Sequence, residues 1–182
     1  MTLPTQPRLL LGPGPSPVSA RVMAALAAPQ RSHLDPDMLA VLDDTRARLR
    51  RIFKAPADSE TLAISGTGSA GMEAVVANLA EPGKRALVVV NGYFGDRLAS
   101  LLARYGAEVD RVEGEWGRAI DPARVGTALS AAKYDLVAVV HAETSTGVRN
   151  PLSDIAVMAR RHDALILVDA VTSLGALPLE VE

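Results

Sequence analysis

The segment Gly66–Gly71, with the sequence GTGSAG, has the residue types that bind a phosphate group. It follows a short apolar run, Thr61–Ser65, and precedes a segment of helical periodicity. Free backbone N–H groups and the helix dipole favour an anion at a helix N-terminus, and glycines let it approach closely. Thr67 and Ser69 add hydroxyl donors. The alternative is a tight turn without a ligand, and the hydroxyl groups favour the phosphate.

The same six residues fit the pattern G-x-G-x-x-G of dinucleotide-binding folds. That pattern is expected to be followed, about 20 residues on, by an acidic residue that binds the ribose. The next apolar run ends at Asn91-Gly92 instead. An NAD(P)-binding, Rossmann-like dehydrogenase domain is therefore the alternative to a simple phosphate site.

Asp169 directly follows the apolar run 164–168, at the end of a predicted strand, where open α/β sheets bind ligands. A carboxylate there is costly unless it meets a cation or several donors. One such partner is a protonated ring nitrogen of a cofactor. The other is a following turn near Thr172 and Ser173, which the carboxylate would cap. Both interpretations stay open from these residues alone.

Two more polar segments follow apolar runs in the same way. His141–Gly147 has five polar side chains after the run 136–140, and it fits either a small polar ligand or a solvated turn. Asn91–Gly95 contains Phe94, in a chain with only 3% aromatic residues. Phe94 fits either a ring that stacks on a planar ligand or a core residue.

A parallel sheet must position these segments, because short aliphatic runs alternate with longer runs of helical period. The predicted strands are residues 61–65, 86–90, 108–112, 136–140 and 164–168. The predicted helices are residues 69–80, 94–105, 122–132 and 151–162. Right-handed crossovers between such strands give an α/β fold of three layers, with a mostly parallel sheet and helices on both faces.

The first residues differ from this pattern. Leu11–Pro17 is rich in glycine and proline and predicts an extended arm. Ser16 then fits the N-cap of a short helix that ends at Ala28, and a second helix is predicted over Asp37–Phe53. We expect residues 1–58 to form this arm and its helices, and residues 59–182 to form the sheet domain.

Composition excludes several classes of protein. The 182 residues include 19 Lys and Arg against 21 Asp and Glu, a net charge of −2, which excludes a generally basic nucleic-acid surface. The absence of cysteine excludes disulfides and thiolate metal sites. His33 and His162 have no second ligand at metal spacing, so no metal site is predicted. Apolar runs are too short to span a membrane and no secretory signal is present, so we expect a cytoplasmic protein.

Six segments, in their order along the chain, resemble the class V, fold-type I pyridoxal-phosphate enzymes. The resemblance is to the alanine–glyoxylate and serine–pyruvate aminotransferase family in particular. The segments are spread along nearly the whole chain and are LLGPGPSPVSARVMAAL (10–26), SHLDPDM (32–38), SGTGSAGMEAVVANL (65–79), NGYFGDR (91–97), HAETSTGV (141–148) and VDAVTSLGALPLEVE (168–182).

The resemblance implies a role for each matching residue. Thr67, Gly68 and Ser69 would bind the phosphate of pyridoxal 5′-phosphate. Phe94 replaces the family's usual ring-stacking tryptophan, and Thr144 would lie beside the phenolic oxygen. Asp169 would pair with the pyridinium nitrogen and so take part in catalysis. In the entry arm, Gly14 would lie near the substrate and the dimer interface. The substrates would be a small amino acid and a 2-oxo acid, with no nucleic acid or membrane partner.

The resemblance also implies parts that these residues do not supply. The family's Schiff-base lysine lies beyond the position of residue 182, and the chain's lysines, Lys54, Lys84 and Lys133, match no family motif. The small C-terminal domain is missing too. We therefore expect the front part of a cofactor domain, inactive alone and homodimeric in its full-length form. A non-catalytic partner subunit without the lysine is the remaining alternative.

Overall fold

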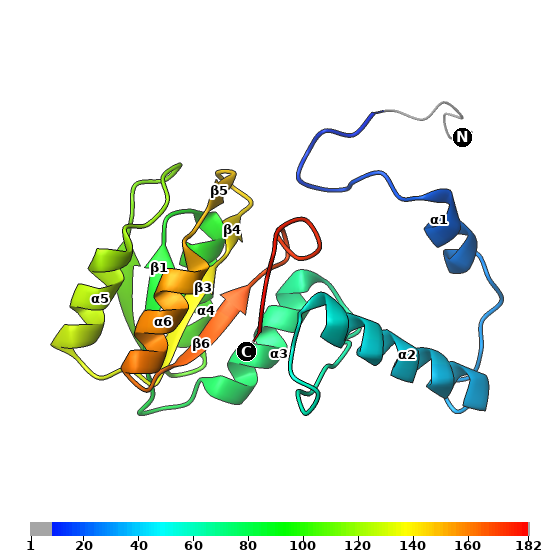
Figure 1. The fold of residues 1–182 in the computed structure, drawn as a ribbon, viewed down its shortest axis with the longest axis horizontal. Helices are drawn as coiled ribbons and strands as arrows, with labels where there is room; N and C mark the ends of the chain where they lie inside the picture. Colours follow the sequence, from blue (N-terminus) through cyan, green and yellow to red (C-terminus); the bar gives the residue numbers. More distant parts are fainter. Residues whose placement is uncertain (1–8, 182) are drawn as a thin grey trace. The chain divides into compact units, whose positions relative to one another are not determined.

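The computed structural model describes residues 9–181, which form two compact units (Figure 1). The first unit extends to Leu49 and the second begins at Arg50. The division falls inside a long helix, α2 (Pro36–Ile52). The domain boundary predicted after residue 58 stays a prediction.

The first unit contains an exposed extended segment, a short helix α1 (Ala20–Leu26) and most of α2. The N-cap predicted at Ser16 is wrong. Ser19 caps α1 instead, since its Oγ accepts a hydrogen bond from the backbone N–H of Val22 at 3.4 Å. Ser19 stands directly before the alanine-rich run that forms the helix, whereas the proline-rich residues after Ser16 stay non-helical.

The second unit is built on a four-stranded parallel sheet with the strand order β2-β1-β3-β6. Its strands are β1 (Arg85–Val90), β2 (Glu108–Glu113), β3 (Leu136–Val140) and β6 (Leu165–Asp169). Its helices are α3 (Gly68–Leu79), α4 (Tyr93–Arg104), α5 (Pro122–Ala131) and α6 (Leu152–Arg161). These bounds confirm the four predicted strands from residue 86 onward and all four predicted helices to within one or two residues.

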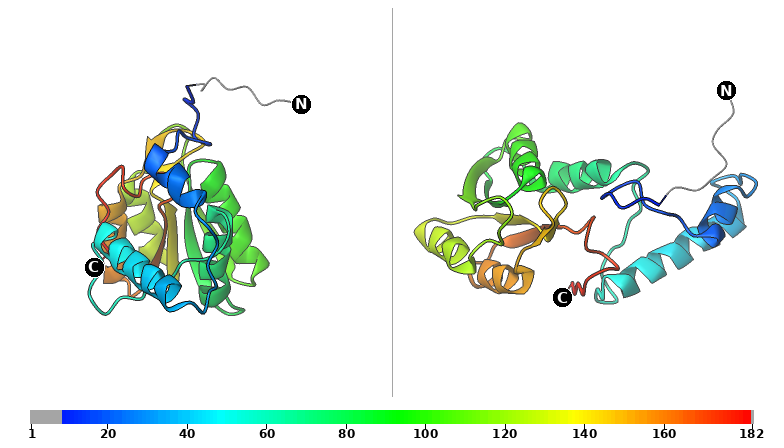
Figure 2. Two further views of the ribbon diagram at one scale, coloured as in Figure 1. Left: turned by 90° about the vertical axis from the view of Figure 1, so that its right-hand side faces the viewer. Right: turned by 90° about the horizontal axis from the view of Figure 1, so that it is seen from above.

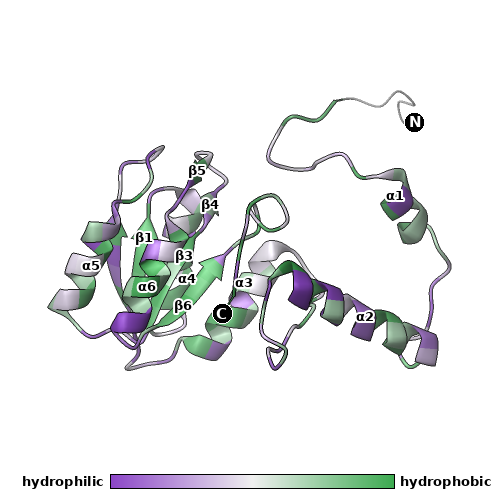
Figure 3. Cartoon of the chain, viewed as in Figure 1, coloured by the Kyte–Doolittle hydropathy of each residue, from purple (hydrophilic) through white to green (hydrophobic). Residues whose placement is uncertain are grey.

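Helices cover both faces of the sheet, as Figures 1 and 2 show. On one face α3 and α4 pack on alternate strand residues such as Val88 and Ala138. On the other face α5 and α6 pack on the residues between them, such as Val89 and Val137. The central strands β1, after its first residue Arg85, and β3 are buried on both sides, and Figure 3 shows them as mainly hydrophobic. The predicted three-layer α/β fold is confirmed.

The strand predicted over Thr61–Ser65 is wrong. These residues are neither helix nor strand, and Leu62 and Ile64 are 64% and 48% exposed. A strand exists only when a neighbour accepts its hydrogen bonds, and no strand among residues 9–181 pairs with this segment. The apolar pattern therefore indicates a preference for the strand conformation, but it does not show whether a neighbouring strand is present to pair with.

Sequence patterns also missed a small hairpin. Strands β4 (Ala142–Glu143) and β5 (Val148–Arg149) pair antiparallel directly after β3. This hairpin holds most of the polar loop predicted at residues 141–147. Separately, none of the helices in the described part of the chain has the length and apolarity that a membrane crossing needs.

Candidate functional site

Buried polar residues gather at one edge of the sheet in the second unit. Because the four strands are parallel, their carboxyl ends lie at the same edge. Within residues 9–181, all the buried polar side chains follow the end of β1, β3 or β6; they are Asn91, His141, Glu143, Asn150 and Ser173. Polar groups are buried at a cost, so each needs partners.

Glu143 is the only carboxylate in this buried group, and it is 0% exposed. Its oxygens accept hydrogen bonds from the backbone N–H groups of Phe94 at 3.3 Å and Gly95 at 3.1 Å, both in the first turn of α4. They also accept from Ser145, at 3.1 Å from its N–H and 2.7 Å from its Oγ. Ser145 Oγ in turn accepts from the N–H of Tyr93 at 3.0 Å. The carboxylate therefore joins the start of α4 to the β4–β5 hairpin.

Asn91 and Asn150 form a reciprocal pair of amide hydrogen bonds. Asn91 lies just before α4 in the chain, and Asn150 lies just after the β4–β5 hairpin. Asn91 Nδ2 donates to Asn150 Oδ1 at 2.8 Å, and Asn150 Nδ2 donates to Asn91 Oδ1 at 3.0 Å. Asn150 also donates to the carbonyl of Val140 at 2.9 Å and accepts from the N–H of Ile120 at 3.2 Å. This pair fixes the end of β1 relative to the end of β3.

His141 fixes the end of β3 relative to the turn after β6. Its Nδ1 lies 3.0 Å from Ser173 Oγ, and its backbone N–H donates to the carbonyl of Asp169 at 2.9 Å. Burial of the imidazole, reinforced by the charge of Arg149, lowers the pKa of His141. The neutral ring is thus the form that the folded protein favours.

Asp169 is half-buried at the carboxyl end of β6. One carboxylate oxygen, Oδ1, accepts from the N–H of Val171 at 3.0 Å and so caps the turn that follows. No residue that the structure describes donates a hydrogen bond to the other oxygen, Oδ2. In the same turn, Thr172 Oγ1 forms a short hydrogen bond with Thr144 Oγ1, which brings the turn and the β4–β5 hairpin together.

The candidate phosphate segment lies beside this turn. A Cβ placed on Gly68 would lie 2.9 Å from Val171 Cγ2, so the start of α3 and the turn after Asp169 are in contact. Thr67 is the N-cap of α3 and its side chain makes no capping bond. The first backbone bond of the helix is from Ala70, to the Thr67 carbonyl. Gly68 and Ser69 are exposed residues whose N–H groups precede that bond, as an anion site requires.

The structure thus brings together the segments that carry six of the seven predicted site residues, all in the second unit. Gly68 contacts the turn after Asp169, and that turn contacts Thr144. Phe94 is half-buried at the start of α4, edge-on to Tyr93 with the ring centroids 5.3 Å apart. Gly14 lies in the exposed arm of the first unit, so its place near the substrate stays a prediction.

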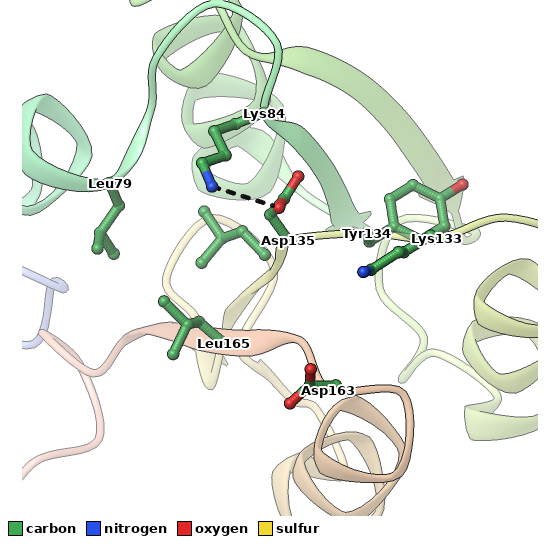
Figure 4. Close-up of a pocket in the computed structure, with 8 residues that line it drawn as sticks. Leu79, Lys84, Lys133, Tyr134, Asp135, Asp163 and Leu165 are labelled. Carbon is green, nitrogen blue, oxygen red and sulfur yellow. Dashed lines mark hydrogen bonds and ion pairs between the residues drawn. The ribbon is translucent and has the colours of Figure 1, made fainter.

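A pocket of about 250 Å³ lies at the opposite edge of the sheet (Figure 4). It is lined by residues at the amino ends of the strands and by α3: Leu79, Lys84, Lys133, Tyr134, Asp135, Leu136, Asp163 and Leu165. Lys84 lies 3.5 Å from Asp135 across its mouth. None of the predicted site residues lines this pocket, so the candidate site is the carboxyl edge.

Residues 15–182 match the family model of class V aminotransferases. This chain belongs to the class V aminotransferase family. The match favours the aminotransferase resemblance of the sequence over the NAD(P)-binding alternative. It includes every predicted site residue except Gly14.

Known members of the class V aminotransferase family resemble the chain in sequence and structure. The mouse alanine–glyoxylate aminotransferase is 36% identical over 182 residues, which is 100% of this chain and 43% of that protein. The crystal structure of an alanine–glyoxylate aminotransferase from Nostoc sp. matches with a TM-score of 0.90 and 42% identity, over 98% of this chain and 48% of that one. The structure of a ureidoglycine–glyoxylate aminotransferase from Bacillus subtilis matches with a TM-score of 0.94 and 36% identity, over 100% and 46%. The chain thus spans less than half the length of these class V relatives.

Sequence reasoning missed the roles of Glu143 and Asn150 in this class V chain. In the sequence, Glu143 is one of several polar residues in a loop, and no motif includes Asn150. One signal was available for Glu143. It is the only carboxylate in the two polar segments that follow strands at this edge, Asn91–Gly95 and His141–Gly147. Asn150 directly precedes Pro151 at the start of α6, which by itself predicts only a turn.

Proposed function

We propose that this chain forms the cofactor-binding part of a pyridoxal 5′-phosphate-dependent aminotransferase. The reaction moves an amino group from a small amino acid, such as alanine or serine, to glyoxylate or pyruvate, and the full-length enzyme is a homodimer. Membership of the class V family supports this proposal, as do the names of its relatives, alanine–glyoxylate and ureidoglycine–glyoxylate aminotransferase.

A single contact carries the proposal. Gly68, at the start of α3, touches Val171, two residues after Asp169. The candidate anion site and the Asp169 carboxylate therefore lie on one rim, as a ligand with a phosphate at one end and a basic nitrogen at the other requires. The N–H groups before the first helical bond of α3 fit the phosphate end of pyridoxal phosphate. Asp169 Oδ2, which accepts no hydrogen bond from residues 9–181, fits the end with the basic nitrogen.

Each predicted residue has one task in this proposal. When bound, pyridoxal phosphate supplies an electron sink for a carbanion at the substrate Cα. The backbone and hydroxyl groups of residues 67–69 would bind the phosphate, and the Phe94 ring would stack on the pyridine ring. The Thr144 hydroxyl would lie beside the phenolic oxygen. The ionised carboxylate of Asp169 would keep a proton on the ring nitrogen, and Gly14 would lie near the substrate.

The lysines of the chain do not serve this site. Lys84 and Lys133 line the pocket at the opposite edge, and Lys54 forms an ion pair with Glu180. The lysine that the family resemblance implies is none of these three. We therefore expect the 182-residue chain by itself to bind the cofactor without turnover. Conversion of alanine and glyoxylate by this chain at ordinary enzyme rates would contradict that expectation.

Binding of pyridoxamine 5′-phosphate to the full chain tests the proposal. This probe carries an amine in place of the aldehyde, so it cannot react with the surface lysines. Calorimetry should show saturable binding, weakened about tenfold or more by Asp169→Asn because a charge-assisted hydrogen bond is lost. Asp163→Asn, at the opposite edge, is the matched control and should leave the affinity unchanged. Thermal stabilisation by NAD but not by pyridoxamine phosphate would refute the proposal.

A further inference from the structure

Glu143 differs from an ordinary helix-capping residue on the surface, because its carboxylate is buried and accepts hydrogen bonds from two separate segments. Its carboxylate is 0% exposed, and none of the ion pairs found in the described residues includes it. A buried charge without a cation is costly, and here only N–H and O–H donors offset that cost. The donors are the backbone groups of Phe94, Gly95 and Ser145 and the Ser145 hydroxyl.

These donors belong to two segments that are far apart in the sequence. Phe94 and Gly95 begin α4, where backbone N–H groups have no partner within the helix. Ser145 follows Thr144 in the turn of the β4–β5 hairpin. One side chain therefore fixes both the helix start that carries the Phe94 ring and the turn that carries the Thr144 hydroxyl.

The packing around Glu143 is close enough to fix its position. A Cβ on Gly92 would overlap Cγ and Cδ of Glu143 and would lie 2.8 Å from Ser145 Oγ. Only glycine lets the end of β1 approach the carboxylate so closely. The Tyr93 N–H also donates to Ser145 Oγ, which closes a ring of hydrogen bonds around the carboxylate.

We propose that Glu143 is a positioning residue that aligns Phe94 and Thr144 on the same planar ring of the ligand. The proposal rests on the function proposed above and adds how the ring, as distinct from the phosphate, is recognised. Glu143 touches neither the ligand nor the phosphate segment in this account. It acts through the backbone of Phe94 and through the turn that carries Thr144.

The proposal predicts different effects on the binding of pyridoxamine phosphate, which has a ring, and of inorganic phosphate, which has none. If Glu143 positions only the groups around the ring, then Glu143→Gln weakens pyridoxamine phosphate and leaves inorganic phosphate unaffected. Gln has the same shape, but its amide group places a donor against the N–H of either Phe94 or Gly95. If Glu143 only supports the fold, both ligands weaken together, because the whole carboxyl edge loosens.

The test measures both ligands on the same proteins. Inorganic phosphate is followed by the amide NMR shifts of Gly68 and Ser69, and pyridoxamine phosphate by calorimetry and by the circular dichroism of its bound ring. We expect Glu143→Gln to weaken pyridoxamine phosphate about tenfold and to change its dichroism, with phosphate affinity unchanged within about twofold. Equal loss for both ligands, or no loss for either, would overturn the proposal.

Two further variants keep the test decisive. Asp121→Asn makes the same carboxylate-to-amide change at the N-terminus of α5, where Asp121 Oδ1 accepts from Ala123 at 3.0 Å, and should change neither affinity. Ser145→Ala removes one donor from Glu143 without removing the carboxylate, and should give a smaller loss of the same selectivity. If Glu143→Gln does not fold, the comparison of the two ligands is made with Ser145→Ala instead. A wild-type chain that binds phosphate but not pyridoxamine phosphate would refute the proposed function itself.

Discussion

Replacement of Asn150 by alanine should destabilise the second unit strongly, although Asn150 is polar and follows the end of a hairpin. Its side chain is 2% exposed and takes part in four hydrogen bonds, two with Asn91, one with the Val140 carbonyl and one with the Ile120 N–H. Alanine removes all four and leaves the groups of its three partners without them. Water cannot reach them readily at this depth.

The magnitude follows from those bonds. Each hydrogen bond contributes about 1 kcal/mol net, and a buried group left without a partner costs about 1–3 kcal/mol. Partial relaxation of the edge reduces the sum, so we expect the free energy of unfolding to fall by about 3 kcal/mol. With a urea m-value of about 2 kcal/mol/M, the unfolding midpoint falls by about 1.5 M.

Urea denaturation followed by far-UV circular dichroism checks this value. Asn78→Ala is the matched control. Asn78 is exposed, and its side chain donates to the Ala74 carbonyl of its own helix, so the change should alter stability by less than about 0.5 kcal/mol. Asn150→Asp should be at least as harmful as Asn150→Ala, because a carboxylate cannot donate to Asn91 or Val140. A midpoint for either Asn150 variant that matches the control would refute the reasoning.

Three further predictions concern other parts of the second unit. Gly95→Ala should cost about 2 kcal/mol in urea denaturation, because its Cβ would lie 2.7 Å from the Val89 carbonyl oxygen and push α4 from β1; unchanged stability would exclude that close approach. Burial lowers the pKa of His141, so its contribution to stability is complete above the ordinary pKa of about 6.5 and is lost as pH falls toward the folded value. His141→Gln should flatten the pH dependence of the thermal midpoint in that window, and an identical slope in both proteins would count against the assignment. The Tyr134 hydroxyl, 2.8 Å from Asp110, is the main cause that lowers the pKa of Asp110, so Tyr134→Phe should raise that pKa in a carboxyl NMR titration; an unmoved titration curve would contradict it.

The sheet could be predicted from the sequence where burial alone determines a strand. β3 and residues 86–90 of β1 are continuous apolar runs because helices cover both of their faces, and that pattern predicts the bounds of both strands to within one residue. Thr61–Ser65 has a similar pattern and no ladder. The residue types of a segment indicate a preference for the strand conformation. Its ladder hydrogen bonds depend on a neighbouring strand, whose presence the segment's own sequence does not show.

The candidate site shows the same division. Parallel strands bring their carboxyl ends to one edge, so the clustering of segments such as Asn91–Gly95 and His141–Gly147 was predictable from chain order. The partners of Glu143 were not, because Phe94 and Gly95 lie 49 and 48 residues away in the chain. Asn91 and Asn150 lie 59 residues apart. Only the packed sheet determines which side chains meet over such separations.

The two edges of the sheet differ in how they respond to salt. At the amino edge, half-exposed charges hold the strands, with Arg85 2.6 Å from Asp110 and Lys84 3.5 Å from Asp135. At the carboxyl edge, the Asn91–Asn150 amide pair and the buried Glu143 carboxylate hold β1, β3 and α4 out of contact with solvent, and the half-exposed pair of Arg111 and Asp96 joins β2 to α4. Dissolved ions screen the half-exposed pairs and scarcely reach the buried bonds. A rise in ionic strength should therefore loosen the amino edge and the contact of β2 with α4, while the buried bonds of Glu143, Asn91 and Asn150 at the candidate site are insulated from it.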